Sequence, residues 1–176
     1  MNTQRHLLPA AAFLFLLSNT AHAALATVQP DAQWSNSQKE SLHDYRCPSN
    51  KVLVGRKHYK DENGSTWYLC GTVTQGSQLQ TFNEEKLVIS YGGGSCPFPK
   101  VVTGRGRTGD ENSEYWLYCA EVRDSWGEPL VPTSTDTRQG LENAHDVRCP
   151  QNQVLGGMRR YGDEEDLTRY YCSKLF

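Results

Sequence analysis

An Asp-Glu pair occurs three times in this 176-residue chain, each time fourteen positions after a cysteine. In the first two copies an asparagine follows the pair, and a tryptophan comes four positions after the asparagine. Carboxylates and amides bond to hydroxyl groups, and an indole stacks on the apolar face of a sugar ring. The candidate sugar-binding residues are Asp61, Glu62, Asn63 and Trp67 in the first copy, Asp110, Glu111, Asn112 and Trp116 in the second, and Asp163 and Glu164 in the third.

The third copy departs from this pattern, because Glu165 stands in place of the asparagine and Arg169 in place of the tryptophan. We therefore expect its site to differ or to be lost. A row of acids could instead hold calcium, but the loop is shorter than an EF-hand and lacks its spacing, so we expect no metal. The same residue types also favour hairpin turns. In that alternative the acids cap backbone amides, and the tryptophans pack in the core.

The acidic pairs belong to a unit that the chain repeats three times without a change in length. A Cys-Pro dipeptide opens each unit, and a second cysteine closes it 23 positions later. Three copies indicate one supersecondary unit used three times. The repeat favours disulfides within each unit, since all three units then have the same local geometry. The expected pairs are Cys47 with Cys70, Cys96 with Cys119, and Cys149 with Cys172.

Each unit has the pattern of a β-hairpin. In the first unit, residues 51–54 form a β-branched arm, 60–64 a turn, and 67–70 an aromatic arm. Val, Tyr and Trp suit a half-buried pleated surface, and Gly, Asn and Asp suit the turn. On the second arm, the period of two places the last cysteine on one face with Tyr68 and its counterparts in the other units. We expect an all-β domain of three pseudo-repeats, trefoil-like or prism-like, with one disulfide in each repeat.

The chain is expected to divide into a signal peptide, residues 1–23, and a single domain, residues 24–176. The signal peptide combines Arg5, an apolar run at 10–17 and an Ala-His-Ala cleavage site ending at Ala23. Such a segment, together with an even number of cysteines, predicts export to an oxidising compartment, periplasmic or extracellular. The three repeats are expected at about 34–84, 85–135 and 136–176.

The remaining sequence features exclude several functions. A formal net charge of −2 does not favour nucleic acid or an anionic membrane as partner, and no later segment is apolar enough to span a membrane. We find no catalytic motif, and expect neither enzymatic activity nor a cofactor. His43-Asp44 and His145-Asp146 resemble base-and-orienter pairs, but adjacent strand residues point to opposite faces. We instead expect these histidines to bond to backbone at the repeat boundaries.

The stretch from Gly109 to Cys119 resembles the dermatopontin family, whose disulfide-looped repeats carry an acidic residue shortly before an aromatic-rich stretch that ends in cysteine. The family's usual Asp-Arg is replaced here by Asp110-Glu111. The resemblance covers most of the chain after residue 23 through three short motifs. It implies a secreted, non-enzymatic protein that binds matrix, cells or carbohydrate, with a bridge inside each repeat.

The first expected function is thus an exported lectin-like or adhesion module for carbohydrate or glycoconjugate surfaces. Three equivalent loops on one face would bind such surfaces through avidity. A secreted inhibitor or immunity protein, with a hydrolase or toxin as its protein partner, is the alternative. A hydrolase assembled from separate repeats ranks last, because it needs a nucleophile or a carboxylate pair that the threefold pattern does not explain.

Overall fold

The computed structural model describes residues 25–61, 63–90, 92–110, 113–161 and 166–176. These residues form fourteen β-strands, and there is no helix among them. The prediction of an all-β fold is therefore confirmed. The expected signal peptide, residues 1–23, lies outside the described residues.

Three long antiparallel hairpins form the framework, one from each repeated unit. A disulfide joins the second arm of each hairpin to the segment just before its first arm, with Cα–Cα distances of 5.8, 5.5 and 5.6 Å along the chain. The predicted pairing within each unit is confirmed, and all six cysteines are bonded. The hairpins are β4 (Lys51–Tyr59) with β5 (Ser65–Gln75), β9 (Val101–Thr108) with β10 (Tyr115–Arg123), and β13 (Val154–Arg160) with β14 (Leu167–Leu175).

Each second arm also pairs with one or two strands from the segment before its own unit, other than the short strand that leads directly to the first cysteine. β7 (Gln80–Ile89) pairs with β10, and β11 (Pro132–Leu141) pairs with β14. On β5 this place is shared by two shorter strands, β1 (Thr27–Pro30) and β2 (Gln38–Lys39). β6 (Ser77–Gln78) forms a short return on the far end of β5.

Each first arm pairs with a short strand that comes from a different unit. β3 (Leu42–Arg46) leads to the first cysteine but pairs with β9 of the second unit. In the same way β8 (Gly93–Ser95) pairs with β13 of the third unit, and β12 (Ala144–Arg148) pairs with β4 of the first. The exchange runs from unit one to two, two to three, and three back to one, so it forms a closed cycle.

The strands form one fourteen-stranded sheet. Within it we distinguish three groups, called the first, second and third sheets: β12-β4-β5 with β1 and β2, then β3-β9-β10-β7, and then β8-β13-β14-β11. Single residue pairs at tight turns link the first sheet to the other two, at Lys39 with Leu42 and at Leu141 with Ala144. Of the two expected architectures, the three-sheet prism is the one that this pairing matches.

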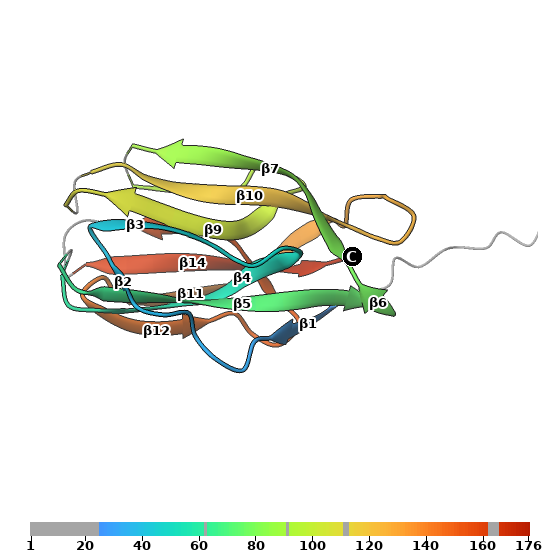
Figure 1. Cartoon of the computed structure of the whole chain (residues 1–176), viewed down its shortest axis with the longest axis horizontal. Coiled ribbons are helices and arrows are strands. Elements are labelled where there is room, and N and C mark those ends of the chain that lie inside the picture. The colour runs from blue at the N-terminus through green and yellow to red at the C-terminus, as the bar shows by residue number, and fades with distance from the viewer. Residues whose placement is uncertain (1–24, 62, 91, 111–112, 162–165) are drawn as a thin grey trace, which may run out of the picture.

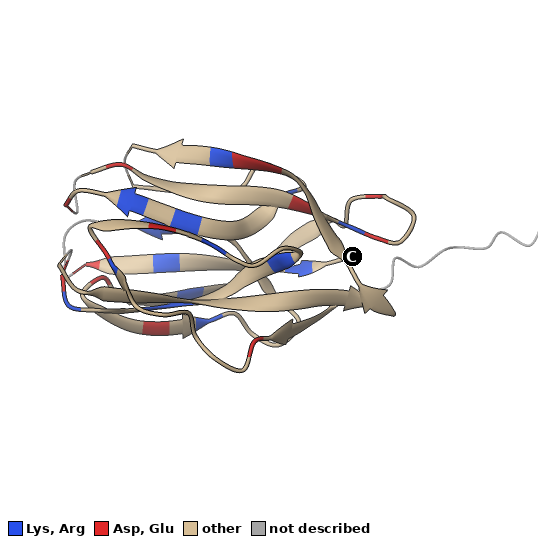
Figure 2. Cartoon of the chain, in the orientation of Figure 1, with Lys and Arg blue, Asp and Glu red and all other residues tan. Residues whose placement is uncertain are grey.

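The hairpins all point the same way. In Figure 1 the ends of β5, β10 and β14 that are nearest their hairpin turns lie together at the left, which we call the turn end, and the C-terminus lies at the right. Acidic residues, drawn red, lie at the turn end in Figure 2, and β9 carries basic residues, drawn blue, near the same end.

The interior is built from equivalent positions, by which we mean positions at the same distance from the first cysteine of each unit. One buried cluster contains Tyr68, Leu117 and Tyr170 together with Cys70 and Cys119, which share a face of the second arms as the period of two predicts. A second cluster contains the equivalent valines of the three first arms, Val52, Val101 and Val154.

Removing one bridge should cost nearly the same in every unit, because each closes a loop of the same sequence separation, 23 residues. We expect the Cys→Ser double variant of any one pair to lower the free energy of unfolding by roughly 3 kcal/mol. Urea unfolding of the three double variants measures this. A bridge whose removal has no effect would show that its hairpin is held independently of the crosslink.

Candidate functional site

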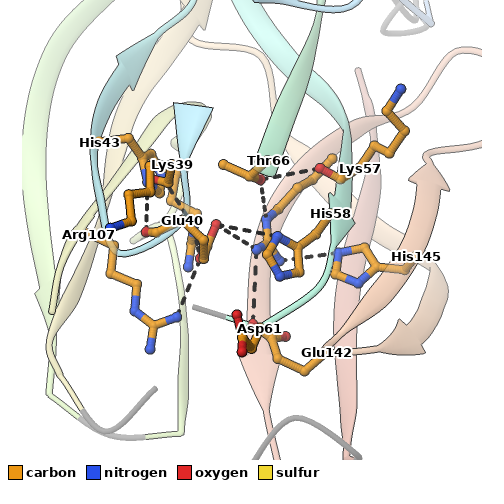
Figure 3. A network of polar contacts seen from close by, with 12 residues as sticks. Lys39, Glu40, His43, Lys57, His58, Asp61, Thr66, Arg107, Glu142 and His145 are labelled. Atoms are coloured by element: carbon orange, nitrogen blue, oxygen red, sulfur yellow. Dashed lines mark hydrogen bonds and ion pairs between the residues drawn. The ribbon is translucent and has the colours of Figure 1, made fainter. Parts of the chain in front are cut away.

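A network of buried charged side chains lies at the turn end, between the three sheets (Figure 3). Its centre is Glu40, which is fully buried in the turn between β2 and β3. The Glu40 carboxylate lies 2.9 Å from Arg56 and 2.7 Å from Arg105. Arg107 adds a contact at 3.4 Å. One carboxylate is thus bonded by arginines of two different units, which the strand exchange brings together.

Glu40, His43, Tyr68 and Arg105 form the first of two equivalent quartets. Nδ1 of His43 faces the backbone oxygens of Lys39 and Glu40 at 3.1 and 2.9 Å. Because a carbonyl only accepts, Nδ1 carries the proton and Nε2 accepts from the Tyr68 hydroxyl at 2.6 Å. Arg105 in turn donates to that hydroxyl at 3.1 Å.

The second quartet, Glu142, His145, Tyr170 and Arg56, has the same arrangement. His145 Nδ1 donates to the Leu141 carbonyl at 2.7 Å, and its Nε2 accepts from Tyr170 at 2.6 Å. Arg56 donates to the Tyr170 hydroxyl at 2.8 Å. Both histidines therefore bond to backbone near the repeat boundaries, as the sequence analysis expected.

The third equivalent set is apolar throughout. The positions of Glu, His, Tyr and Arg are occupied by Ile89, Gly92, Leu117 and Met158. Ile89, Leu117 and Met158 are buried in one cluster. The four changes occur together because a buried charge without its partners is costly, whereas a complete apolar set is not.

Burial and the arginines fix the protonation of this network. Burial alone raises the pKa of Glu40, but Arg105 and Arg56 outweigh it and hold the pKa of that carboxyl well below its usual range. Burial, aided by Arg105, lowers the pKa of His43 to about 4. Burial and Arg56 lower the pKa of His58 to about 4 and of His145 to about 3. The three histidines are therefore neutral at pH 7.

The second sheet holds Trp116 flat on its outer face. The indole lies against Gly106, where an added Cβ would stand 2.3 Å from the ring, so a side chain at this position would displace it. Trp116 Nε1 donates to Asp44 at 3.1 Å, and the Lys86 ammonium lies 3.7 Å from the ring centroid. Asp44 also accepts from Tyr118 at 3.0 Å. The indole of Trp116 is thus bonded at its edge and covered on its outer face.

The first sheet holds Trp67 differently, because Lys57 stands where the second sheet has Gly106. Lys57 pairs with Trp67 on one side and with Asp146 on the other, and keeps them apart. Its ammonium lies 4.6 Å from the Trp67 ring centroid. The result is an outward-facing groove of about 400 Å³ that we call the Trp67 groove. It is lined by Lys57, His58, Tyr59, Trp67, Ala144, His145 and Asp146.

The acids of the hairpin turns bond within their own turns. Asp61 Oδ1 accepts from the backbone N–H of Asn63 at 2.9 Å, and Asp110 Oδ1 accepts from the Ser113 hydroxyl at 3.0 Å. Arg107 donates to the backbone carbonyl of Asp110, which ties the second turn to the buried network. Among the described turn residues, neither Asp61 nor Asn63 lines the Trp67 groove. The predicted residues Glu62, Glu111, Asn112, Asp163 and Glu164 lie outside the described residues.

Sequence reasoning did not find the buried network or the role of Lys57, Tyr59 and Asp146. A signal for the network was present, since Arg56 and Arg105 occupy the same position of two strands otherwise rich in valine and glycine. Their partners could not be named, because Arg105 meets Glu40 and Arg56 meets Glu142 only through strands exchanged between units.

Within the described ranges, no group of three or more His, Cys, Asp and Glu residues is placed to hold a metal ion. Those ranges also contain no helix that is long and apolar enough to cross a membrane. Comparisons of the chain with models of protein families, with curated proteins and with solved structures found no match. The resemblance to the dermatopontin family stays an expectation.

We predict that Glu40→Gln destabilises the protein by about 3–5 kcal/mol, because three buried arginines lose the carboxylate that they share. The matched control is Asp136→Asn, which breaks the exposed pair with Arg138 at 3.3 Å. Its expected cost is below about 1 kcal/mol. Urea unfolding of both variants at pH 7 makes the comparison, and equal costs would contradict a central role for Glu40.

Acid should weaken the fold before the carboxylates titrate. His43, His58 and His145 have folded pKa values of about 4, 4 and 3, below the value of 6.5 for a free histidine. Between these values the unfolded chain binds more protons than the folded one. The contribution of the three histidines to the free energy of unfolding is therefore fully present above pH 6.5, and it falls as the pH drops toward 4. Each histidine contributes up to about 1.4 kcal/mol per pH unit. Urea midpoints between pH 7 and pH 4 measure this, and a constant midpoint would refute it.

Proposed function

We propose that the protein is an exported, non-enzymatic binding module that recognises carbohydrate or glycoconjugate surfaces through the Trp67 groove. The observation that carries this proposal is the half-buried indole of Trp67 beside an exposed Tyr59, in a groove of about 400 Å³. That volume lies within the range of roughly 300–1,000 Å³ that small-molecule sites occupy.

The residues of the groove suit a sugar ring. Trp67 and Tyr59, the latter 61% exposed, offer aromatic faces to the apolar side of the ring. Lys57 donates hydrogen bonds and Asp146 accepts them, which matches the hydroxyl groups at the ring edge. Asp146 lies 3.5 Å from Arg148, so it is oriented without being buried.

The comparison between equivalent sheets supports the assignment to Trp67 rather than Trp116. In the second sheet, Asp44 and Lys86 already bond and cover the indole. In the first sheet, Lys57 prevents the corresponding bond between Trp67 and Asp146. In the first sheet a ligand can therefore bond to the edge of the indole, which Asp44 bonds in the second sheet.

Export is supported by the cysteine chemistry. Three disulfides indicate an oxidising environment, extracellular or periplasmic. The signal-peptide pattern of residues 1–23 agrees with the same destination. Proteins that leave the cytoplasm meet the glycans of cell envelopes and matrices, which are the surfaces that the groove would recognise.

We predict that Trp67→Ala and Tyr59→Ala each weaken binding by roughly tenfold or more, about 1.4 kcal/mol, because each removes one stacking face. A glycan array of the oxidised protein selects the ligand, and titration calorimetry measures the affinity. Tyr59 is largely exposed, so its variant should keep the fold even if Trp67→Ala loosens it.

The matched control is Trp126→Ala, which removes a tryptophan that is 88% exposed and lies outside the groove. Its affinity should equal that of the unchanged protein. The proposal fails if no glycan binds, or if loss of Trp126 matters as much as loss of Trp67.

A further inference from the structure

The third sheet has a hollow of its own, on the outer surface where β8, β13, β14 and β11 meet. Its volume is about 290 Å³. Ser95, Phe98, Gly156 and Tyr171 line it, together with the hydroxyl-bearing Ser173 and with Lys100. It lies beside the Cys96 end of its sheet, whereas the Trp67 groove lies on a different sheet near the turn end.

The equivalent place on the second sheet is filled by the protein. Arg46 lies over the ring of Tyr118, with its guanidinium carbon 3.7 Å from the ring centroid. Arg46 is held by Glu84 at 2.8 Å, and Thr103 donates to the same carboxylate at 2.7 Å. Tyr118 is consequently only 3% exposed.

The first sheet has a narrower hollow at this position, of about 190 Å³. Its floor carries the buried side chains of Val54 and Leu69, and Arg148 borders it. Arg148 also lies 4.9 Å from the ring of Trp34.

Three residues of the third sheet's hollow, Ser95, Gly156 and Phe98, differ from their equivalents in ways that open or line it. Ser95 stands where the other sheets have Arg46 and Arg148, so the covering arginine is missing. Gly156 stands where the others have Val54 and Thr103, so the floor is lower.

Phe98 is the third difference. It stands where the other units have Ser49 and Gln151, and its side chain is 72% exposed. Ser95 and Gly156 are smaller than their equivalents and thus uncover Tyr171, while an aromatic residue in place of a polar one at position 98 adds a wall beside it.

The chemistry of the lining is that of a neutral polyhydroxylated ligand. Tyr171 and Phe98 supply aromatic faces, and Ser95 and Ser173 supply hydroxyls that both donate and accept. The Lys100 ammonium is paired with Glu85 at 2.9 Å, so it adds no unbalanced charge. The volume lies at the lower limit for small-molecule pockets, roughly 300 Å³, which fits a single sugar ring better than an oligosaccharide.

We propose that this hollow is a second saccharide-binding site, specific for one sugar ring and formed by Phe98, Tyr171, Ser95 and Gly156. Taken with the Trp67 groove, and resting in this respect on the proposed function, it makes the protein bivalent. Two sites on different sheets cannot bind one short glycan, so the protein links separate glycans and gains avidity on a surface.

The experiment closes the hollow with residues that stand at the equivalent positions of another sheet. The double variant Ser95→Arg with Gly156→Val restores residues that the first sheet carries at these positions. A Cβ on Gly156 would meet the Ser173 hydroxyl at 3.1 Å, a contact that a rotation of the serine relieves. Phe98→Ser, which restores the residue of the first unit, is a second variant at an exposed position.

Saturation-transfer NMR with a panel of methyl glycosides measures each site in the oxidised protein. Trp67→Ala protein should still transfer saturation to at least one methyl glycoside. Adding Ser95→Arg and Gly156→Val, or Phe98→Ser, should weaken that binding by roughly tenfold or more. Beads coated with the bound sugar should be agglutinated by the unchanged protein and not by a protein with either site removed.

The proposal is overturned if Trp67→Ala protein binds no methyl glycoside, or if closing the hollow leaves its binding unchanged. The Ser95→Arg, Gly156→Val protein tests the Trp67 groove separately, because Trp67 is intact there. Binding by this variant alone supports the groove and refutes the hollow, and binding by Trp67→Ala alone does the reverse.

Discussion

The exchange of strands between units is the constraint on which the rest of the structure depends. No hairpin completes its own sheet, since β3, β8 and β12 each pair with the first arm of another unit. The disulfides hold each hairpin together locally, but only the cycle of exchanges joins the hairpins into a prism. We therefore expect the three units to fold as one cooperative domain, because each lacks a strand until the others are in place.

The exchange also explains why charges are buried at the turn end. The residues just before β3 and β12 carry Glu40 and Glu142, and pairing with a neighbouring unit sets these carboxylates against that unit's arginines. At the third equivalent place an apolar set fills the same volume. Two solutions to one packing problem thus coexist in one molecule: a charged, hydrogen-bonded quartet, used twice, and a hydrophobic quartet, used once. A mixture of the two would leave a buried charge without a partner.

Recognition is expected where the outer faces depart from the repeat. Equivalent places on the three sheets differ by one or a few side chains, and those differences decide whether the protein covers its own aromatic residues. Gly106 lets Trp116 reach Asp44, whereas Lys57 keeps Trp67 from Asp146. Ser95 and Gly156 uncover a tyrosine whose equivalent, Tyr118, is covered by an arginine. The inner positions of the repeat maintain the scaffold, while its outer positions are free to diverge.

The sequence by itself determined what is local: the three hairpins, the disulfide inside each, the face that Tyr68 and its counterparts share with the last cysteine, and the all-β class. These follow from spacing and from a period of two, which act over a few residues. Only the tertiary structure decided which unit each short strand joins, and therefore which arginine meets Glu40 and what lies beside Trp67. The acidic turns attracted attention in the sequence, yet the described acids bond within their turns, and Trp67 faces residues brought by β12 from about 80 positions away. Such contacts are made by closure of the whole prism, and no local pattern of residue types encodes them.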